Sequence, residues 1–198
     1  MRNITFNQKY WFLIGIQIAV IVGFYLMAHF HLEFGEKVLL KILPPPDPLS
    51  LFQGHYLVLN YEISLLKNGE YSFVSKKYSS PSQIHNYETV FIVLEKRGSF
   101  FQAKEVSTEL PKKRPFIEGT VMKNRNGDLE IRYGIEDYFI PEKNFTKIEQ
   151  KFRDYLRQRK EIFAEISLNK FGKPLLRKII VEKEAINLED SENNFLIR

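Results

Sequence analysis

The sequence predicts a β-rich α+β protein. One N-terminal transmembrane helix precedes a compact domain of antiparallel strands, arranged as a meander or sandwich, with one amphipathic helix. Residues 10–30 form a long apolar run without a charged side chain. Phe and Tyr are plentiful, at 17 and 10 of 198 residues, and aromatic side chains favour strands. Glycine-containing turn signals recur along the rest of the chain, as antiparallel hairpins require.

The composition narrows the classes of function. Hydrophobic residues make up 44% and charged residues 27%, which is typical of a globular chain. The absence of cysteine excludes disulfides, thiolate metal sites and cysteine nucleophiles. A net charge of +5 favours solubility or contact with anionic headgroups over nucleic-acid binding.

The N-terminal run reads YWFLIGIQIAVIVGFYLMAHF over residues 10–30. About 20 apolar residues are what a helix needs to cross a ~30 Å hydrocarbon core. The apolar side chains would surround the helix, which disfavours a core helix of a soluble protein. A cleavable signal peptide is the nearer alternative, but its apolar stretch is typically shorter and ends in a small-x-small site, which residues 27–30 match poorly. We therefore predict an uncleaved anchor.

The charges that flank the anchor predict its orientation. Arg2 and Lys9 precede it, whereas the lysines that follow are accompanied by glutamates. Positive charge is retained on the cytoplasmic side of a membrane. We expect residues 1–9 in the cytoplasm, a domain over 31–184 outside it, in the periplasm or at the cell surface, and a polar tail over 185–198.

The first part of the domain contains two predicted strands and a turn. Residues 36–43 predict a short strand that the proline-rich segment 44–48 must end. Residues 55–65 alternate between apolar and polar side chains, which predicts one half-buried strand. Asn68 and Gly69 are a two-residue hairpin signal, with 70–75 expected as the returning strand. The residues expected on the buried face of the second strand are Leu57, Leu59, Tyr61, Ile63 and Leu65.

Three further hairpins and a helix follow a polar loop over 76–86. The expected hairpins pair residues 89–94 with 100–106, 116–122 with 129–133, and 162–168 with 175–181, each around a glycine turn. Thr146 and Glu149 fit a capping box, which predicts a helix that begins near Thr146. Its apolar face, expected to pack on the sheet, contains Ile148, Phe152, Tyr155 and Leu156.

The segment Gly54-His55-Tyr56-Leu57-Val58-Leu59-Asn60-Tyr61 resembles the signature of the GDYXXLXY family, with His55 where the family has Asp. Asp47-Pro48, the segment 116–121 and the block 133–142 resemble further parts of the family pattern in the same order. The resemblance implies a bacterial membrane-anchored protein, of a kind often encoded beside multi-spanning membrane proteins. It implies no activity.

Motifs that would indicate catalysis are not found. The sequence contains neither a P-loop nor a dinucleotide fingerprint, and no Gly-x-Ser-x-Gly elbow. Glu136 and Asp137 would face opposite ways on an extended chain, so with Pro141 and Glu142 we interpret them as residues that shape a loop. The histidines are too scattered for a zinc site. We expect no cofactor, metal, small-molecule ligand or nucleic acid.

Two functions remain. We favour a non-catalytic binding or accessory subunit that sits in the lipid bilayer and joins a multi-spanning membrane protein. The alternative is a membrane-surface hydrolase of envelope material, using His55, Tyr56, Glu136 and Glu142. Gly54 is expected to supply a bend and Tyr61 to be a core residue with a bonded hydroxyl. The candidate residues are Gly54, His55, Tyr56, Leu59, Tyr61, Glu136, Pro141 and Glu142.

Overall fold

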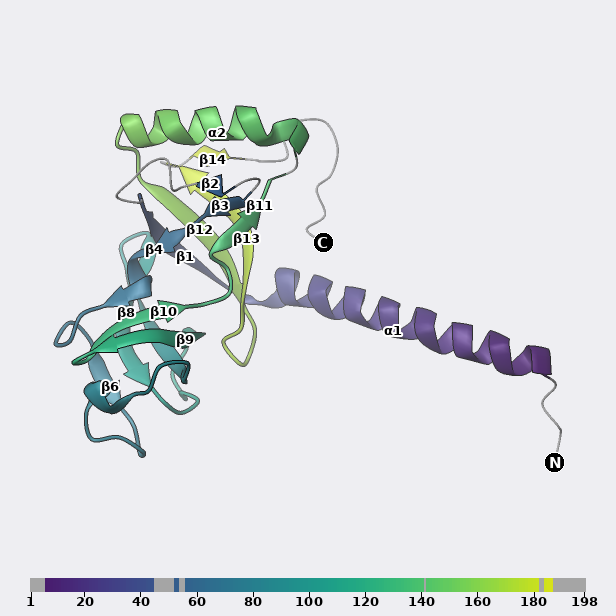
Figure 1. The fold of residues 1–198 in the computed structure, drawn as a ribbon, viewed down its shortest axis with the longest axis horizontal. Coiled ribbons are helices and arrows are strands. Elements are labelled where there is room, and N and C mark those ends of the chain that lie inside the picture. The colour runs from purple at the N-terminus through teal and green to yellow at the C-terminus, as the bar shows by residue number, and fades with distance from the viewer. Residues whose placement is uncertain (1–5, 45–51, 54–55, 141, 182–183, 187–198) are drawn as a thin grey trace.

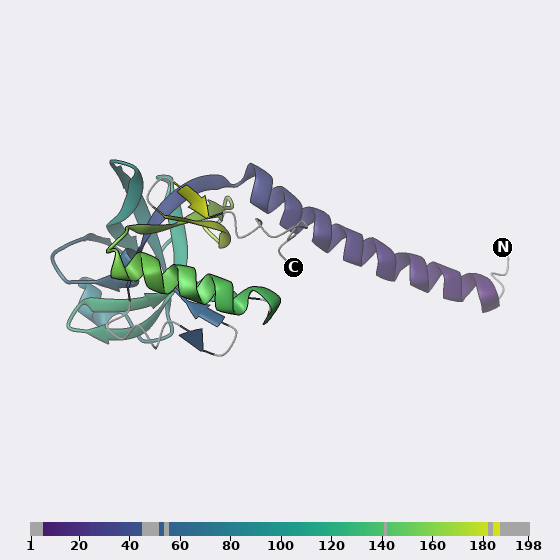
Figure 2. The same cartoon turned by 90° about the horizontal axis from the view of Figure 1, so that it is seen from above.

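A long helix projects from a β-rich domain (Figure 1). The computed structural model describes residues 6–44, 52–53, 56–140, 142–181 and 184–186. Helix α1 (Phe6–Phe34) contains the whole of the predicted 10–30 segment. Figures 1 and 2 show that most of its length extends away from the strands. Over the residues that the structure describes, none of the helices combines the length and apolar character that crossing a membrane requires.

The domain contains a large sheet and a small one, and most strand pairs are antiparallel. The large sheet has the order β14-β13-β12-β1-β8-β7-β9-β10-β5, with β4 paired to β1 and β6 to β8; the small sheet has the order β11-β3-β2. Two pairings, β1 with β8 and β6 with β8, are parallel. The large-sheet strands are β1 (Glu36–Leu43), β4 (Asn60–Tyr61), β5 (Leu65–Leu66), β6 (Ser72–Val74), β7 (Thr89–Arg97), β8 (Phe100–Ser107), β9 (Phe116–Arg125), β10 (Asp128–Arg132), β12 (Ile162–Leu168), β13 (Pro174–Val181) and β14 (Glu184–Ile186); the small-sheet strands are β2 (Phe52–Gln53), β3 (Tyr56–Val58) and β11 (Asp137–Phe139).

Strand β1 lies inside the large sheet, between β12 and β8, and matches the predicted 36–43 strand. It pairs with β12 along most of its length, from Glu36 opposite Leu168 to Ile42 opposite Ile162. Its alternate residues Val38, Leu40 and Ile42 are buried in the core. The three later hairpins also form as predicted, as β7–β8, β9–β10 and β12–β13. Strand β14 carries the sheet slightly into the segment expected to be a polar tail.

The prediction of one continuous strand over 55–65 is wrong. The segment divides into β3, β4, a 3-10 turn (Glu62–Ser64) and β5. The buried alternation holds from Leu57 through Ile63, but Leu65 is 57% exposed. The cause is a change of partner, because β3 pairs in the small sheet while β4 and β5 pair with β1 and β10 of the large sheet.

The hairpin predicted at Asn68 and Gly69 is also wrong, although the turn itself forms, with φ of +91° at Gly69. Its flanking strands separate: β5 pairs with β10, and β6 runs parallel to β8. The Asn68 backbone N–H donates to Asp128 Oδ1 at 2.8 Å, and Asn68 Nδ2 donates to the carbonyl of Asn126 at 2.9 Å. The turn therefore docks on the β9–β10 turn instead of closing its own hairpin.

Helix α2 (Glu142–Arg157) begins one turn earlier than the capping box predicts. An acidic residue, Glu142, occupies its first turn, where it complements the helix dipole. The predicted apolar face is confirmed for Phe152, which is buried, and for Ile148 and Tyr155, which pack against the core. The Leu156 side chain lies outside the described residues.

The burial pattern within residues 55–65 predicts how two substitutions affect the stability of the domain. Leu59 is almost completely buried, whereas Tyr56 is 48% exposed. Leu59→Ala should lower the free energy of unfolding by roughly 2–5 kcal/mol through lost transfer energy and a residual cavity. Tyr56→Ala should cost clearly less. Denaturant unfolding of the purified protein measures both, and a larger cost for Tyr56→Ala than for Leu59→Ala would contradict the observed facing of the strand.

Candidate functional site

The two most distinctive segments found in the sequence analysis lie against each other. Strand β3 pairs with β11, so that Tyr56 lies opposite Phe139 and Val58 opposite Asp137. Beyond this ladder, the Leu59 N–H donates to the carbonyl of Glu136 at 2.7 Å. We call the contact between residues 56–63 and 133–139 the signature junction.

Two tyrosines bond across the signature junction in opposite directions. The Tyr61 hydroxyl donates to the carbonyl of Ile135 at 2.7 Å, and the Tyr133 hydroxyl donates to the carbonyl of Ile63 at 2.6 Å. Both side chains are buried. Burial raises the pKa of both phenols well above its ordinary value, and the nearby Glu136 carboxylate raises it further. The two hydroxyls therefore stay protonated and act as hydrogen-bond donors.

The Glu136 carboxylate closes the turn between the two sheets. Its Oε1 accepts a hydrogen bond from the Tyr133 N–H at 2.5 Å, and its Oε2 accepts one from the Gly134 N–H at 2.8 Å. Gly134 has a φ of +79°, a conformation that glycine adopts without strain. Arg132 Nε lies 3.9 Å from Oε2. Both carboxylate oxygens of Glu136 thus accept hydrogen bonds from backbone N–H groups of the turn that precedes it.

Gly119 brings a third segment of the family pattern to the same place. A Cβ added to Gly119 would lie 2.6 Å from Ile131 Cγ2 and 2.9 Å from the ring of Tyr133. Both contacts are shorter than real Cβ atoms show. Gly119 is therefore needed so that the Tyr133 ring can pack over β9 and reach Ile63.

An open groove of about 500 Å³ lies beside the signature junction. Its lining carries both signs of charge, and two of the lining residues are bonded to each other: Arg132 Nη2 donates to Asp137 Oδ2 at 3.0 Å. The charged residues that line the groove are Glu118, Arg132, Glu136, Asp137 and Lys173. Such a lining suits a polar contact, and it does not gather the groups of a nucleophile and its base.

Among the residues that the structure describes, the polar side chains suggested for a hydrolase do not meet in this groove. Glu136 lines it, but neither Tyr56 nor Glu142 does. Tyr56 instead packs edge-on against Phe139, with ring centroids 5.4 Å apart, and Glu142 is exposed at the start of α2. The candidates Gly54, His55 and Pro141, like Asp47 and Pro48, lie outside the described residues.

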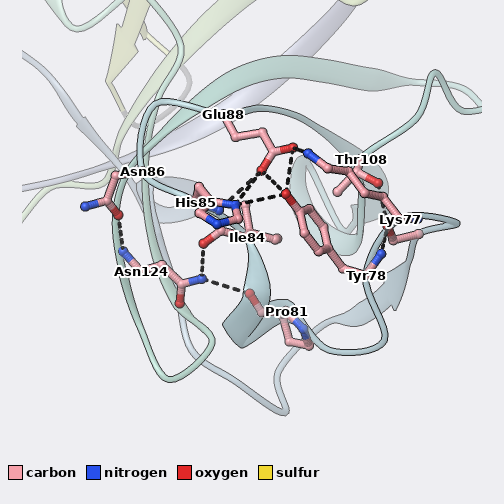
Figure 3. Close-up of polar contacts among 10 residues, drawn as sticks. Lys77, Tyr78, Pro81, Ile84, His85, Asn86, Glu88, Thr108 and Asn124 are labelled. Atoms are coloured by element: carbon pink, nitrogen blue, oxygen red, sulfur yellow. Dashed lines mark hydrogen bonds and ion pairs between the residues drawn. The ribbon is translucent and has the colours of Figure 1, made fainter.

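A second polar cluster was not predicted from the sequence, which indicated only a polar loop (Figure 3). The Tyr78 hydroxyl lies 2.9 Å from Glu88 Oε2 and 3.0 Å from His85 Nδ1. Lys77 Nζ donates to Glu88 Oε1 at 2.8 Å. Burial opposes ionisation of Glu88, but the hydrogen bonds from Lys77, Tyr78 and the His85 N–H outweigh it and lower the pKa of the carboxyl.

The cluster holds a loop in place. Asn124 Nδ2 donates to the carbonyls of Pro81 and Ile84, at 2.8 and 2.7 Å, from the neighbouring strand β9. Ser80 and Gln83 form a capping box around the short 3-10 helix Pro81–Gln83, and this spacing was the available sequence signal. Among the described residues, no group of three or more His, Cys, Asp or Glu could hold a metal ion. The hydrogen bonds of this cluster thus have a structural role, because they account for the shape of the loop.

These observations define a class of protein: a β-rich α+β domain, preceded by a long helix, whose two sheets are joined at a tyrosine-bonded junction. The chain belongs to the GDYXXLXY family, because the family model described as GDYXXLXY protein matches residues 17–179. The resemblance noted from the sequence is therefore confirmed. No curated protein and no solved structure matches the sequence.

The signature junction predicts the effect of removing either hydroxyl. Tyr61→Phe and Tyr133→Phe each leave a buried carbonyl without its donor, so each should lower the free energy of unfolding by roughly 1–3 kcal/mol. Tyr87→Phe is a matched control, because Tyr87 is 75% exposed. Denaturant unfolding compares the three variants. Equal stabilities for all three would show that the two buried hydrogen bonds do not hold the sheets together.

The lowered pKa of Glu88 predicts a pH dependence. Because the carboxyl is more acidic in the folded than in the unfolded chain, its contribution to stability is present above the unfolded pKa and is lost as the pH falls through the folded pKa. The stability difference between the native protein and Glu88→Gln should therefore be greatest near neutral pH and shrink under acid conditions. A difference that stays constant down to pH 3 would contradict this.

Proposed function

We propose that this chain is a membrane-anchored, non-catalytic binding subunit of a larger integral membrane assembly. The observation that carries the proposal is the apolar surface of α1. Large side chains are exposed on every side of this helix, among them Trp11 at 73% and Ile21 at 68% exposure. Apolar surface of this extent is unfavourable in water, and a lipid bilayer or a protein partner would remove it.

A bilayer suits α1 better than a groove on a partner. The apolar side chains surround the helix, whereas a helix that binds a groove carries them on one face. The described side chains run from Tyr10 to Leu26, a few residues short of the roughly 20 that a span needs. The sequence extends this run with Met27, Ala28 and Phe30. These features support insertion of α1, with Arg2 and Lys9 on the cytoplasmic side and the domain outside.

The proposal of a non-catalytic subunit is supported by the way the domain uses its buried polar groups. The hydroxyls of Tyr61 and Tyr133 and the carboxylate of Glu136 all bond to backbone groups. Such groups fix a shape and are not available to a substrate. A domain of fixed shape held beside a membrane is suited to binding. The resemblance to the family implies that its members are often encoded beside multi-spanning membrane proteins, and we therefore propose such a protein as the partner.

The proposal is tested by membrane extraction and co-purification. The tagged native chain should stay in membranes after alkaline carbonate treatment and retain a multi-spanning protein in mild detergent. Ile21→Lys should weaken its insertion, because a lysine near the middle of a span costs roughly 2.5–3.5 kcal/mol. Leu65→Lys is the matched control, since Leu65 is an exposed apolar residue of the domain.

Two results would contradict the proposal. Release of the native chain by carbonate would show that α1 is not inserted in the membrane. A reporter at the C-terminus that works only outside the cytoplasm should be active, and an inactive but well-expressed fusion would contradict the proposed orientation.

A further inference from the structure

We infer that the domain has a second membrane contact, a surface beside α1 that binds anionic lipid headgroups. This surface consists of Lys112, Lys113, Arg114, Lys170 and Phe171, and we call it the headgroup patch. The inference rests on the proposed function, because it requires that α1 be inserted in the bilayer. It adds that the domain itself lies on the bilayer surface in an orientation fixed by charge.

The fold places the headgroup patch at the membrane end of the domain. Only Gly35 separates α1 from β1, and the first residue of β1, Glu36, lies opposite Leu168 at the end of β12. The β12–β13 turn, residues 169–173, therefore begins where α1 ends. Helix α1 contacts both strands of this hairpin, and Figures 1 and 2 show the hairpin beside the domain end of α1.

A second loop is bonded to this turn. Arg114 Nη2 donates to the carbonyl of Lys170 at 2.6 Å. The N–H of Glu118 donates to the carbonyl of Gly172 at 2.9 Å, and a Cβ at Gly172 would come within 2.6 Å of the Phe116 ring. These contacts join the Lys112–Arg114 loop to the hairpin tip, so that the two loops form one surface.

The side chains of the headgroup patch suit a headgroup layer. Phe171 is 50% exposed at the hairpin tip, and Lys170 Nζ lies 5.0 Å from the centroid of its ring. Lys112, Lys113 and Arg114 are exposed as well. Aromatic rings settle at the membrane interface, and lysine and arginine near the surface are attracted to anionic lipids.

The acidic residues nearby reduce this charge without cancelling it. Lys113 Nζ lies 3.6 Å from Glu105 Oε2, and Lys113 remains 74% exposed. Glu36 is exposed at the start of β1, and Glu118 is partly buried. The exposed cations lie on the two loop tips, whereas Glu36, Glu105 and Glu118 lie on strands. Glu109 lies in the same loop as Lys112, but its carboxylate is paired with Lys76 Nζ at 3.0 Å. An anionic membrane therefore meets the cations first.

The absence of cysteine in the sequence makes a direct test possible. A single dye on Leu110→Cys, an exposed position in the second loop, reports contact through quenching by headgroup-labelled lipids. The full chain is placed in nanodiscs of phosphatidylcholine alone or mixed with phosphatidylglycerol. Stronger quenching is expected in the anionic discs, and added salt should reduce it. A dye on Tyr87→Cys, exposed in another loop, is the control for general quenching.

Charge reversal identifies the residues responsible. Each cation near an anionic surface contributes about 1 kcal/mol, so the ratio of docked to undocked domain should fall about fivefold or more for each lysine reversed. Lys112→Glu with Lys170→Glu should therefore abolish the extra quenching in anionic discs. Lys67→Glu with Lys151→Glu, at exposed positions outside the patch, should leave it unchanged.

The outcomes separate this inference from the proposed function. A chain that does not enter nanodiscs at all would overturn the membrane anchor. A chain that enters them but shows the same quenching in both lipids would overturn the headgroup patch alone. Loss of a co-purified protein on Lys112→Glu with Lys170→Glu, without any lipid effect, would also overturn it and show that the surface binds an acidic protein partner.

Discussion

The domain depends on a pair of buried tyrosine hydrogen bonds that satisfy backbone carbonyls close to the places where the chain changes sheet. The chain passes from the small to the large sheet between β3 and β4, and from the large to the small sheet between β10 and β11. At such a crossing, backbone carbonyls leave one ladder before they enter another, and a buried carbonyl without a donor is costly. Tyr61 supplies a hydroxyl to the carbonyl of Ile135 at the β10–β11 crossing, and Tyr133 supplies one to the carbonyl of Ile63, in the 3-10 turn that follows β4. Each segment therefore satisfies a buried carbonyl of the other, so residues 56–63 and 133–139 stabilise one another.

This arrangement explains the residue types of the family pattern as structural requirements. Tyrosine is needed at position 61 because phenylalanine would fill the same volume but leave the Ile135 carbonyl unpaired. Glutamate at position 136 accepts two backbone N–H groups in the turn that precedes β11. Glycine at position 119 leaves the space that the Tyr133 ring occupies. A signature made of such residues specifies a fold, and function is then left to the surfaces that the fold presents.

The parts of the structure that were predicted correctly are those determined by residues close together in the sequence. The three later hairpins were predicted correctly because each glycine turn joins strands that pair with one another. The segment 55–65 was misread because its period-two alternation is satisfied equally by one strand or by two short strands in different sheets. Which sheet receives Tyr61 depends on Ile42 and Ile135, far away in the sequence, and no local pattern contains that choice. The Tyr78 cluster was missed for the same reason, since Glu88 and Asn124 meet the loop only in the folded domain.

The same constraints connect the signature junction to helix α1 and to the headgroup patch. Ile42 of β1 pairs with Tyr61, and the other end of β1 begins one residue after α1 ends. The register of β1 against β12 then determines that the β12–β13 turn lies beside α1. A hydrogen bond from Arg114 holds the basic loop to this turn, so the position of the cations follows from the packing of the core. If α1 is inserted in a bilayer, the junction that holds the sheets together also determines which face of the domain meets the lipid and which face remains accessible to a partner.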